Sequence, residues 1–340
     1  MNILITSAGR RGYIIKYFKD ALKGYGGKVY AGNSSHLSTA FEYADGSVIT
    51  PLIYDKEYIP FLINFCKQKQ IEVIISLFDV DLLILAQNKN VFQENGIKVI
   101  VSGEEVVEIC NDKWKTYEFC MENNICVPKT YKAVASVKQD VLSGELKFPV
   151  VIKPRWGMGS IGIFEADDET ELDIMVQKCR KAIISTYLRY EAAVDIENAV
   201  IIQEKLTGEE FGLDVINDLE GNFCSDVIRM KYAMRAGETD CAMVVQIRKI
   251  DLFAEKLSQA LRHIANLDVD VFVNGDKVYM LEMNARFGGG YPFSHLAGVD
   301  LPKAIIKWIN GENLADELQI KRYNRVVQKD ISFVDLTRFQ

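Results

Sequence analysis

The chain has few of the residues that build transition-metal sites or disulfide frameworks. Only three of its 340 residues are histidine, at positions 36, 263 and 295, and no two of them have metal-ligand spacing. The seven cysteines include no Cys-x-x-Cys pair, and several lie within apolar patterns. These absences argue against a zinc site, and they predict reduced, mostly structural thiols.

A long apolar run and an excess of positive charge are also missing. No stretch approaches the roughly 18 apolar residues of a membrane span, and Arg10 and Arg11 follow the N-terminus too closely for a secretory leader. The net charge of −7 argues against general binding to nucleic acid or to an anionic membrane. With 49% hydrophobic and 26% charged residues, we expect a cytoplasmic protein of two or three domains.

Short apolar runs alternate with helical patterns over roughly the first 108 residues. Residues 2–6 read as a buried strand, and the turn at 7–12 leads into a helix whose apolar positions follow the helical period. Further strands are expected at 29–31, 48–49, 73–77 and 99–101, and helices near 57–69, 80–90 and 103–110. This alternation predicts a parallel, doubly wound α/β sheet.

The first turn does not match a dinucleotide-binding fingerprint. Ser7-Ala-Gly-Arg-Arg-Gly12 lacks the first glycine of Gly-x-Gly-x-x-Gly, and Asn33 stands where an acid for the ribose hydroxyls is expected. A helix N-terminus flanked by Arg10 and Arg11 suits a small carboxylate or phosphate better than NAD. Because such sheets bind ligands beyond the carboxyl ends of their strands, we expect this turn and Asp79 to Asp81 to contribute to a substrate site.

The rest of the chain predicts α+β lobes with mostly antiparallel strands. Asn111-Asp112 caps a helix, and the strand from Pro149 ends in Lys153, ahead of a glycine-rich hairpin at 155–162. Beyond it we expect a helix at 168–190, strands at 200–205, 211–216, 221–230 and 242–247, a helix at 251–265, and a hairpin of strands 269–273 and 277–283.

A polar motif near the end of the last strand carries the chemistry. Glu282, Asn284 and Arg286 stand two residues apart, ahead of three glycines at 288–290. Side chains at this spacing leave the same face of a strand, so the three groups would meet a ligand together. Two oxygen donors, a guanidinium and backbone N–H groups in a glycine turn suit a magnesium polyphosphate.

Several such features follow one another along the chain: Lys113 on a capped helix, Lys153 at a strand end, the glycine-rich hairpin, the acidic segment 203–211, Asp270, and Glu282-x-Asn284-x-Arg286. This ordered set resembles the ATP-grasp superfamily, in particular the members related to the carbamoyl-phosphate synthetase large chain. The resemblance implies a Rossmann-like pre-ATP-grasp domain (1–108) and a two-lobed ATP-grasp fold. Lobe A with its flap would span 109–198, and lobe B with hinge, metal and phosphate site 199–340.

The resemblance also implies roles for individual residues. Lys113 and Lys153 would hold the α and β phosphates of ATP, and Gly157, Gly159 and Ser160 would belong to a flap that closes over the triphosphate. The hinge that meets the adenine would consist of Gln203, Glu204, Lys205 and Leu206, and Glu210 would bind the ribose. The metal ligands for Mg²⁺, or Mn²⁺ in its place, would be Asp270, Glu282 and Asn284, with Asp268 as the alternative to Asp270. Arg286, Lys231 and Arg235 would act on the transferred phosphate, whereas His295 is expected to be structural.

The implied activity is that of a carboxylate-amine ligase. ATP would phosphorylate a carboxylate, and an amine would then displace phosphate to give an amide or peptide-type bond. The partners would be small molecules, without nucleic acid or membrane, and two copies of the chain could pair. Two alternatives remain open: an enzyme that phosphorylates bicarbonate to carboxyphosphate, and a non-catalytic ATP-binding regulatory protein. Full carbamoyl-phosphate synthesis is disfavoured, because in that family it uses two phosphorylation steps on paired units and this chain has one ATP-grasp unit.

Overall fold

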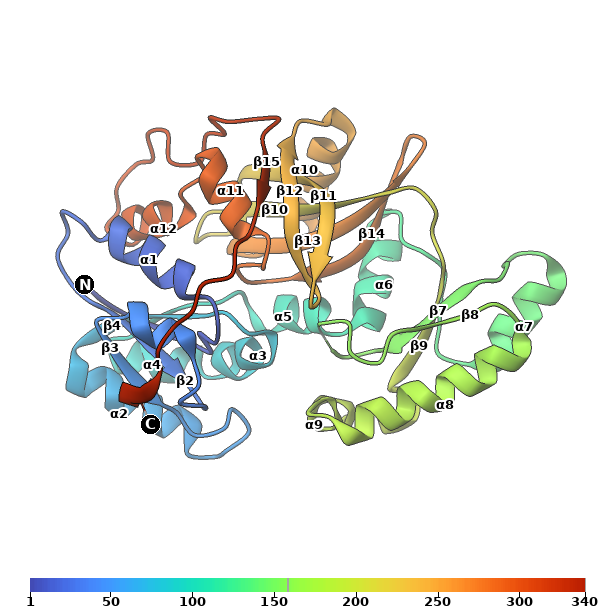
Figure 1. The fold of residues 1–340 in the computed structure, drawn as a ribbon, viewed down its shortest axis with the longest axis horizontal. Coiled ribbons are helices and arrows are strands. Elements are labelled where there is room, and N and C mark those ends of the chain that lie inside the picture. Colours follow the sequence, from blue (N-terminus) through green and yellow to red (C-terminus); the bar gives the residue numbers. More distant parts are fainter. Residues whose placement is uncertain (158, 340) are drawn as a thin grey trace.

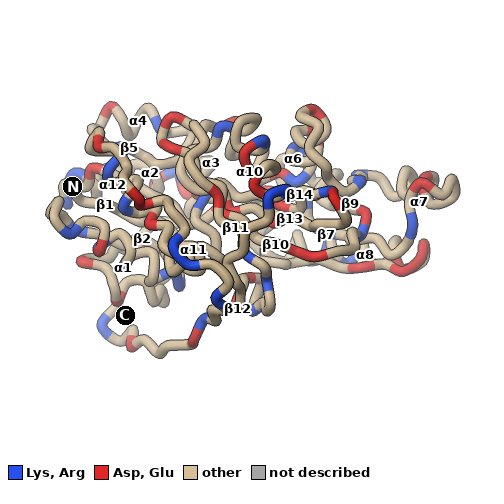
Figure 2. Tube along the Cα trace, turned by 90° about the horizontal axis from the view of Figure 1, so that it is seen from above, with Lys and Arg blue, Asp and Glu red and all other residues tan. Residues whose placement is uncertain are grey.

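The computed structural model describes residues 1–157 and 159–339, and it contains three sheets that follow one another along the chain (Figure 1). A five-stranded parallel sheet forms the N-terminal domain. A four-stranded sheet, with a long helix running below it in this view, lies at the opposite end of the molecule, and a six-stranded antiparallel sheet stands between and above the other two sheets. Lys and Arg positions are interspersed with Asp and Glu positions along the chain trace (Figure 2).

The N-terminal sheet has the Rossmann strand order β3-β2-β1-β4-β5, with every pair parallel. Its strands are β1 (Asn2–Thr6), β2 (Val29–Asn33), β3 (Gly46–Ile49), β4 (Ile71–Ser76) and β5 (Lys98–Ile100), and the helices are α1 (Gly12–Ala21), η1 (Thr39–Tyr43), α2 (Tyr58–Lys69), α3 (Asp79–Gln87), α4 (Lys89–Glu94) and α5 (Glu104–Asn111). The helix expected near 80–90 is present as α3, but it ends at Gln87 and a separate helix, α4, follows. Asn88 ends α3 and its side-chain amide donates to the carbonyl of Ile84 at 2.8 Å.

The buried carboxylate of Asp81 ties the ends of the central strands together. It accepts hydrogen bonds from the hydroxyls of Thr6 at 2.6 Å, Ser7 at 3.1 Å, Ser76 at 2.7 Å and Tyr58 at 2.8 Å. Since these partners consume its acceptor capacity, Asp81 shapes the switch point between β1 and β4 instead of facing a ligand, contrary to the sequence-based expectation.

The second sheet belongs to the segment that carries the glycine-rich loop, and its order is β6-β9-β7-β8. Its elements are α6 (Lys113–Glu122), β6 (Thr130–Tyr131), α7 (Val134–Ser143), β7 (Val150–Pro154), β8 (Phe164–Ala166), α8 (Glu169–Ser185), α9 (Leu188–Ala192), η2 (Ile196–Asn198) and β9 (Val200–Glu204). The helix expected at 168–190 is interrupted at Thr186, which is extended and whose hydroxyl donates to the carbonyl of Ala182 at 2.8 Å.

The third sheet runs β14-β13-β10-β11-β12-β15. Its elements are β10 (Glu209–Asn217), β11 (Phe223–Arg235), β12 (Glu238–Val245), α10 (Arg248–Leu261), β13 (Ala265–Asn274), β14 (Lys277–Asn284), α11 (Tyr291–Ala297), α12 (Leu301–Ile309), β15 (Val326–Gln328) and η3 (Thr337–Phe339). The helix expected to reach residue 265 ends at Leu261, because Arg262 takes a left-handed φ of 53° and β13 then begins.

Strand alternation divides the third sheet into an apolar face and a polar face. Phe211, Leu213, Val269 and Val271 are fully buried against the apolar residues of α10. The opposite face carries charged and amide side chains on four strands, namely Glu210, Asp214, Arg229, Lys231, Asp268, Asp270, Glu282 and Asn284. The apolar face therefore packs into the core of the lobe, whereas the polar face is available to bind ligands.

The C-terminal segment crosses back from the third sheet to the first domain (Figure 1). After β15 the chain runs to Phe339, whose ring meets that of Phe41 edge-on with centroids 5.6 Å apart. We propose to keep the three-part division at 1–108, 109–198 and 199–340, although α6 packs against β14 across the second boundary. Within the described residues, no helix is both long and apolar enough to cross a membrane.

Candidate functional site

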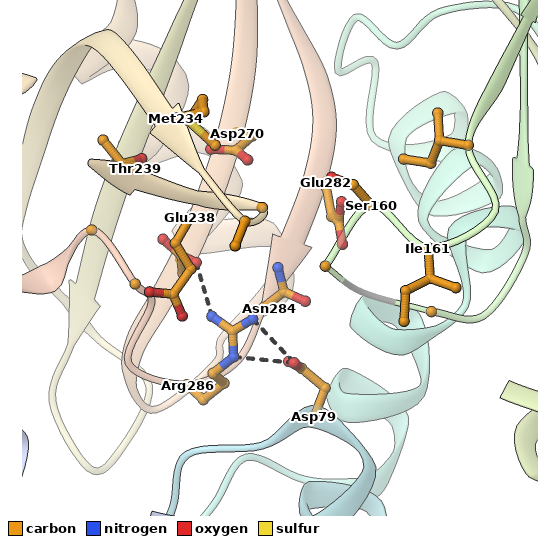
Figure 3. Close-up of a pocket in the computed structure, with 18 of the residues that line it drawn as sticks. Asp79, Ser160, Ile161, Met234, Glu238, Thr239, Asp270, Glu282, Asn284 and Arg286 are labelled. Carbon is orange, nitrogen blue, oxygen red and sulfur yellow. Dashed lines mark hydrogen bonds and ion pairs between the residues drawn. The ribbon is translucent and has the colours of Figure 1, made fainter. Parts of the chain in front are cut away.

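A cavity of about 590 Å³ lies between the polar face of the third sheet, the glycine-rich loop and the N-terminal domain (Figure 3). Most of the residues predicted for the site line it, namely Lys113, Lys153, Gly157, Gly159, Ser160, Glu210, Lys231, Asp270, Glu282, Asn284 and Arg286. The topological switch point between β1 and β4 closes one end, where Asp79 begins α3. The three sheets thus meet at one site.

The acidic ladder of β13 and β14 faces this cavity. In the antiparallel register Asp270 lies opposite Glu282 and Asp268 lies opposite Asn284, so all four side chains leave the same face. Both aspartates that the sequence offered as alternatives therefore line the cavity. Burial raises the pKa of Asp270 to about 6, although Lys231 opposes this effect from 2.6 Å.

These oxygen donors fit a hard cation that is shared with a polyphosphate. Within residues 1–157 and 159–339, no group of three or more His, Cys, Asp or Glu side chains forms a metal cage. Mg²⁺ rarely needs one, because it is usually held by one or two carboxylates together with phosphate oxygens and water. Asp270, Glu282 and the amide oxygen of Asn284 offer such a set on paired strand positions.

Arg286 connects this sheet to the N-terminal domain. Its Nε and Nη2 donate to Oδ2 of Asp79 at 3.1 and 3.0 Å, and its Nη1 donates to Oδ2 of Asp268 at 2.8 Å (Figure 3). Burial opposes the charge of Arg286, but the two carboxylates outweigh it and raise its pKa. The other carboxylate oxygen of Asp79, Oδ1, is buried without a partner within the described chain.

A buried ion pair lies next to Lys113 at the lobe A end of the cavity. Asp112 caps α6 by accepting from the backbone N–H of Trp114 at 2.9 Å, and it grips Arg155 through two contacts of 2.7 Å. Lys113, the first residue of α6, donates through Nζ to the carbonyl of Gly157 at 2.6 Å. Arg155 does not line the cavity itself, and its contact with Asp112 was not predicted from the sequence because the two residues are 43 positions apart.

The glycine-rich loop touches the turn between β11 and β12. A Cβ atom on Gly237 would stand 3.1 Å from the backbone of Gly159, and Gly237 has a φ of 77°, so both the close approach and the backbone conformation favour glycine where the two lobes meet over the cavity. Gly157, with φ of 146°, takes a backbone conformation that other residues rarely adopt. Met158 of the predicted flap lies outside the described residues.

The predicted hinge does not line this cavity. Gln203 is buried and donates through Nε2 to the hydroxyl of Thr130 at 2.9 Å, and the carboxylate of Glu204 accepts from the backbone N–H of Lys129 at 3.2 Å. Lys205 and Leu206 follow at the end of β9 and are likewise absent from its walls. The adenine role of 203–206 therefore remains a proposal.

Lys231 and Arg235 are not brought together on the cavity wall. Lys231 points into the cavity and binds both Glu210 and Asp270 at 2.6 Å, whereas Arg235 pairs with Asp240 at 2.7 Å and lines a neighbouring cavity. Bulges between Lys231 and Met234 shift the register of β11 against β12. Such shifts interrupt the regular alternation of side chains along a strand, and the two basic residues of the predicted cluster line different cavities.

Arg229 is a cavity residue that the sequence reading did not single out. Its side chain is buried and pairs with Asp214, and it donates to the hydroxyl oxygen of Ser294 at 3.0 Å and to the carboxylate of Asp268 at 3.3 Å. The available signal was its two-residue spacing from Lys231. His295 lies away from these groups and stacks on Tyr17 with ring centroids 3.6 Å apart.

Comparisons with known families agree with this architecture. Residues 3–100 match the PylC-like N-terminal domain, and residues 110–290 match the ATP-grasp domain. The chain belongs to the ATP-grasp family. The Rossmann-like domain followed by an ATP-grasp fold, expected from the sequence, is thereby confirmed.

The relatives of this ATP-grasp chain catalyse different reactions. The carbamoyl phosphate synthase large chain of Clostridium acetobutylicum is 22% identical over 304 residues, which are 86% of this chain and 27% of that protein. This chain therefore spans about a quarter of that relative's length. An L-amino acid ligase from Bacillus licheniformis has a similar structure, with a TM-score of 0.73, 18% identity, and coverage of 96% of this chain and 79% of that one. The biotin carboxylase domain dimer of Hydrogenobacter thermophilus 2-oxoglutarate carboxylase, solved with MgADP and bicarbonate, is also similar. Its TM-score is 0.72 at 17% identity, and the match covers 96% of this chain and 73% of that one. At these identities the structural likeness shows the fold alone.

Proposed function

We propose that this ATP-grasp protein is an ATP-dependent carboxylate-amine ligase that releases ADP and phosphate. The observation that carries the proposal is the cavity itself, in which Asp270, Glu282 and Asn284 face Lys113 and Lys153 beneath a glycine-rich loop. Carboxylates on one wall and lysines on the other suit the two partners of a magnesium polyphosphate. ATP-grasp enzymes generally use ATP and Mg²⁺.

The proposed roles follow the positions of the side chains. Lys113 and Lys153 hold the α and β phosphates, the loop with Ser160 covers the triphosphate, and Glu210 binds the ribose. Asp270, Glu282 and Asn284 would hold Mg²⁺, which supplies charge neutralisation at the phosphates. Lys231 and Arg286 face the phosphoryl group in transfer. Arg235 lines the adjoining cavity, so in this proposal it does not contact the transferred phosphate directly.

The proposed reaction has two balanced steps. A carboxylate oxygen attacks the γ-phosphorus of ATP, the bond to the β,γ-bridging oxygen breaks, and ADP leaves with the electron pair. An amine nitrogen then attacks the carbonyl carbon of the acyl phosphate, phosphate departs, and the nitrogen loses a proton. Catalysis would rest on positioning and electrostatic stabilisation without a covalent enzyme intermediate. The substrates would be small molecules; a homodimer is a further part of the proposal.

Isotope transfer tests both steps. The protein would be incubated with MgATP, a library of amines and carboxylates labelled with ¹⁸O in the carboxyl group. We expect ADP release that requires both partners, a product whose mass is acid plus amine minus water, and one ¹⁸O in the released phosphate. ADP release independent of any amine, or phosphate without label, would contradict the ligase proposal. Bicarbonate-dependent ADP release would favour carboxyphosphate formation, and tight ATP binding without turnover would favour a regulatory protein.

A pH dependence of nucleotide binding is expected from Lys153. Burial of Lys153 and the positive charge of Lys113 lower the pKa of Lys153 to about 8, although the carboxylate of Glu282 opposes this shift. A bound polyphosphate favours the charged form, so the affinity for a non-hydrolysable ATP analogue should fall by up to about tenfold per pH unit above about pH 8. Titration calorimetry in buffers of different ionisation heat should reveal proton uptake on binding.

The control for this pH dependence is Lys153→Arg. A guanidinium keeps its charge throughout the range, so this variant should bind the analogue with little proton uptake and a flat pH profile. Equal proton uptake by the wild type and by Lys153→Arg would assign the titration to another group.

A further inference from the structure

A second cavity of about 370 Å³ adjoins the ATP cavity. Its walls come from the turn after β1, the turn between β11 and β12, and the C-terminal segment beyond β15. Both cavities are lined by Arg10, Arg11, Ala236, Glu238 and Thr239, so they meet at this boundary. Glu238 is also drawn among the side chains that line the ATP cavity (Figure 3).

The charges of the second cavity favour an anion. Its lining contains Arg10, Arg11, Arg235 and Lys329 against Glu238, Asp240 and Asp330. The first two carboxylates are paired within the chain. Glu238 lies 3.5 Å from Arg11 and 3.3 Å from Lys329, and Asp240 lies 2.7 Å from Arg235. Asp330 accepts from the backbone N–H of Ile331 at 2.8 Å.

Arg10 and Tyr13 supply donors that the chain does not use. Arg10 is exposed at the junction of the two cavities, and its side chain makes no hydrogen bond or ion pair with the described residues. The hydroxyl oxygen of Tyr13 is buried in the wall of the second cavity and likewise lacks a partner among them. Buried polar groups normally find a partner, so an unpaired phenol beside a cavity points to a ligand.

One wall of this cavity is formed by the C-terminal segment, which lies outside the two domains that match known families. Lys329, Asp330 and Ser332 follow the segment 110–290 that matches the ATP-grasp domain. The backbone N–H of Lys329 donates to the carbonyl of Asp240 at 2.8 Å, and Phe339 is packed on Phe41 at the far end. The segment is therefore held at both ends, and it closes the side of the cavity away from the ATP site.

We propose that this second cavity binds an anionic group, a carboxylate or a phosphate ester, at the far end of a substrate whose reacting end lies in the ATP cavity. The inference rests on the proposed ligase function for the reacting end alone. Arg10 supplies the charge, the Tyr13 hydroxyl donates a hydrogen bond, and the C-terminal wall limits the length of the substrate. The favoured substrate is thus doubly functional: an acid or amine with a second, anionic terminus.

Equilibrium binding tests the site without turnover. The full chain saturated with MgADP would be titrated with three probes: glutarate, glycerol 3-phosphate, and butyrate as a monoanion of similar length. At least one of the first two is expected to bind about tenfold more tightly than butyrate. Arg10→Ala should remove that difference, Arg10→Lys should retain part of it, and Tyr13→Phe should weaken it about threefold. Which probe wins distinguishes the carboxylate from the phosphate ester.

Matched controls separate this inference from the ligase proposal. Arg180→Ala removes an exposed arginine of α8 and should leave all three affinities unchanged. Equal affinity of the wild type for the three probes, or a preference that survives in Arg10→Ala, would overturn the anion site. Arg10-dependent binding by a protein that shows no amine-dependent ADP release would support the site and contradict the ligase function alone.

Discussion

Replacing Glu282 by glutamine is expected to lower the rate of ADP formation by at least about a thousandfold, or about 4 kcal/mol of barrier. The side chain lies opposite Asp270 across β13 and β14, and its nearest cation in the structure is Lys113 at 3.7 Å. Glutamine keeps the shape but removes the charge that would hold Mg²⁺ beside the phosphates. Steady-state ADP formation over a range of Mg²⁺ concentrations measures the loss, and we expect the apparent Mg²⁺ requirement to rise.

The matched control for this substitution is Glu209→Gln. Glu209 is an exposed acid at the start of β10, on the same sheet, and it does not line the cavity. Its replacement should leave ADP formation within about twofold of the wild type. Both variants should unfold at the wild-type temperature, because Glu282 is partly exposed and lies outside the apolar core. Undiminished ADP formation by Glu282→Gln would contradict the proposal that Glu282 of β14 binds Mg²⁺.

Much of the site was predictable because strand periodicity is local. Glu282, Asn284 and Arg286 share a spacing of two, as do Asp268 and Asp270, so each set lies on one face of its strand. That the two sets face each other could not be predicted, because a register shift between Asp270 and Val271 places Asp270 opposite Glu282, whereas the register that starts at Asn274 and Lys277 would place it opposite Leu281. The same rule left the choice between the two aspartates open. It could not be decided from spacing, because both occupy the cavity face.

The remaining features depend on contacts between distant segments. The Asp79–Arg286 pair joins residues 207 positions apart, and Arg11 donates to the carbonyl of Phe287 at 2.9 Å across 276 positions. Both depend on how the N-terminal domain docks on lobe B, which no local pattern encodes. The separation of Arg235 from Lys231 has a different cause, because register shifts in β11 between these two residues interrupt the strand alternation.

The second large effect is expected for Asp79→Asn, a substitution at the contact between the N-terminal domain and lobe B. Asp79 is a positioning residue, because it holds two nitrogens of Arg286 through one carboxylate oxygen, and both side chains are nearly buried, at 4% and 8% exposed. Asparagine loses the charge that orients the guanidinium toward the phosphoryl group. We expect kcat for ADP formation to fall roughly 10- to 100-fold, with a much smaller change in KM for ATP.

A double-mutant cycle with Arg286→Lys distinguishes positioning from general damage. If Asp79 acts through Arg286, adding Asp79→Asn to Arg286→Lys should cost far less than it costs in the wild type. Asp20→Asn, an exposed pair with Lys23 on the surface, serves as the neutral control. Thermal unfolding monitors the fraction folded, and the other partner of Arg286, Asp268 at 2.8 Å, should keep the fold intact. Additive losses, or a loss of kcat that follows the unfolded fraction, would reduce Asp79 to a domain contact.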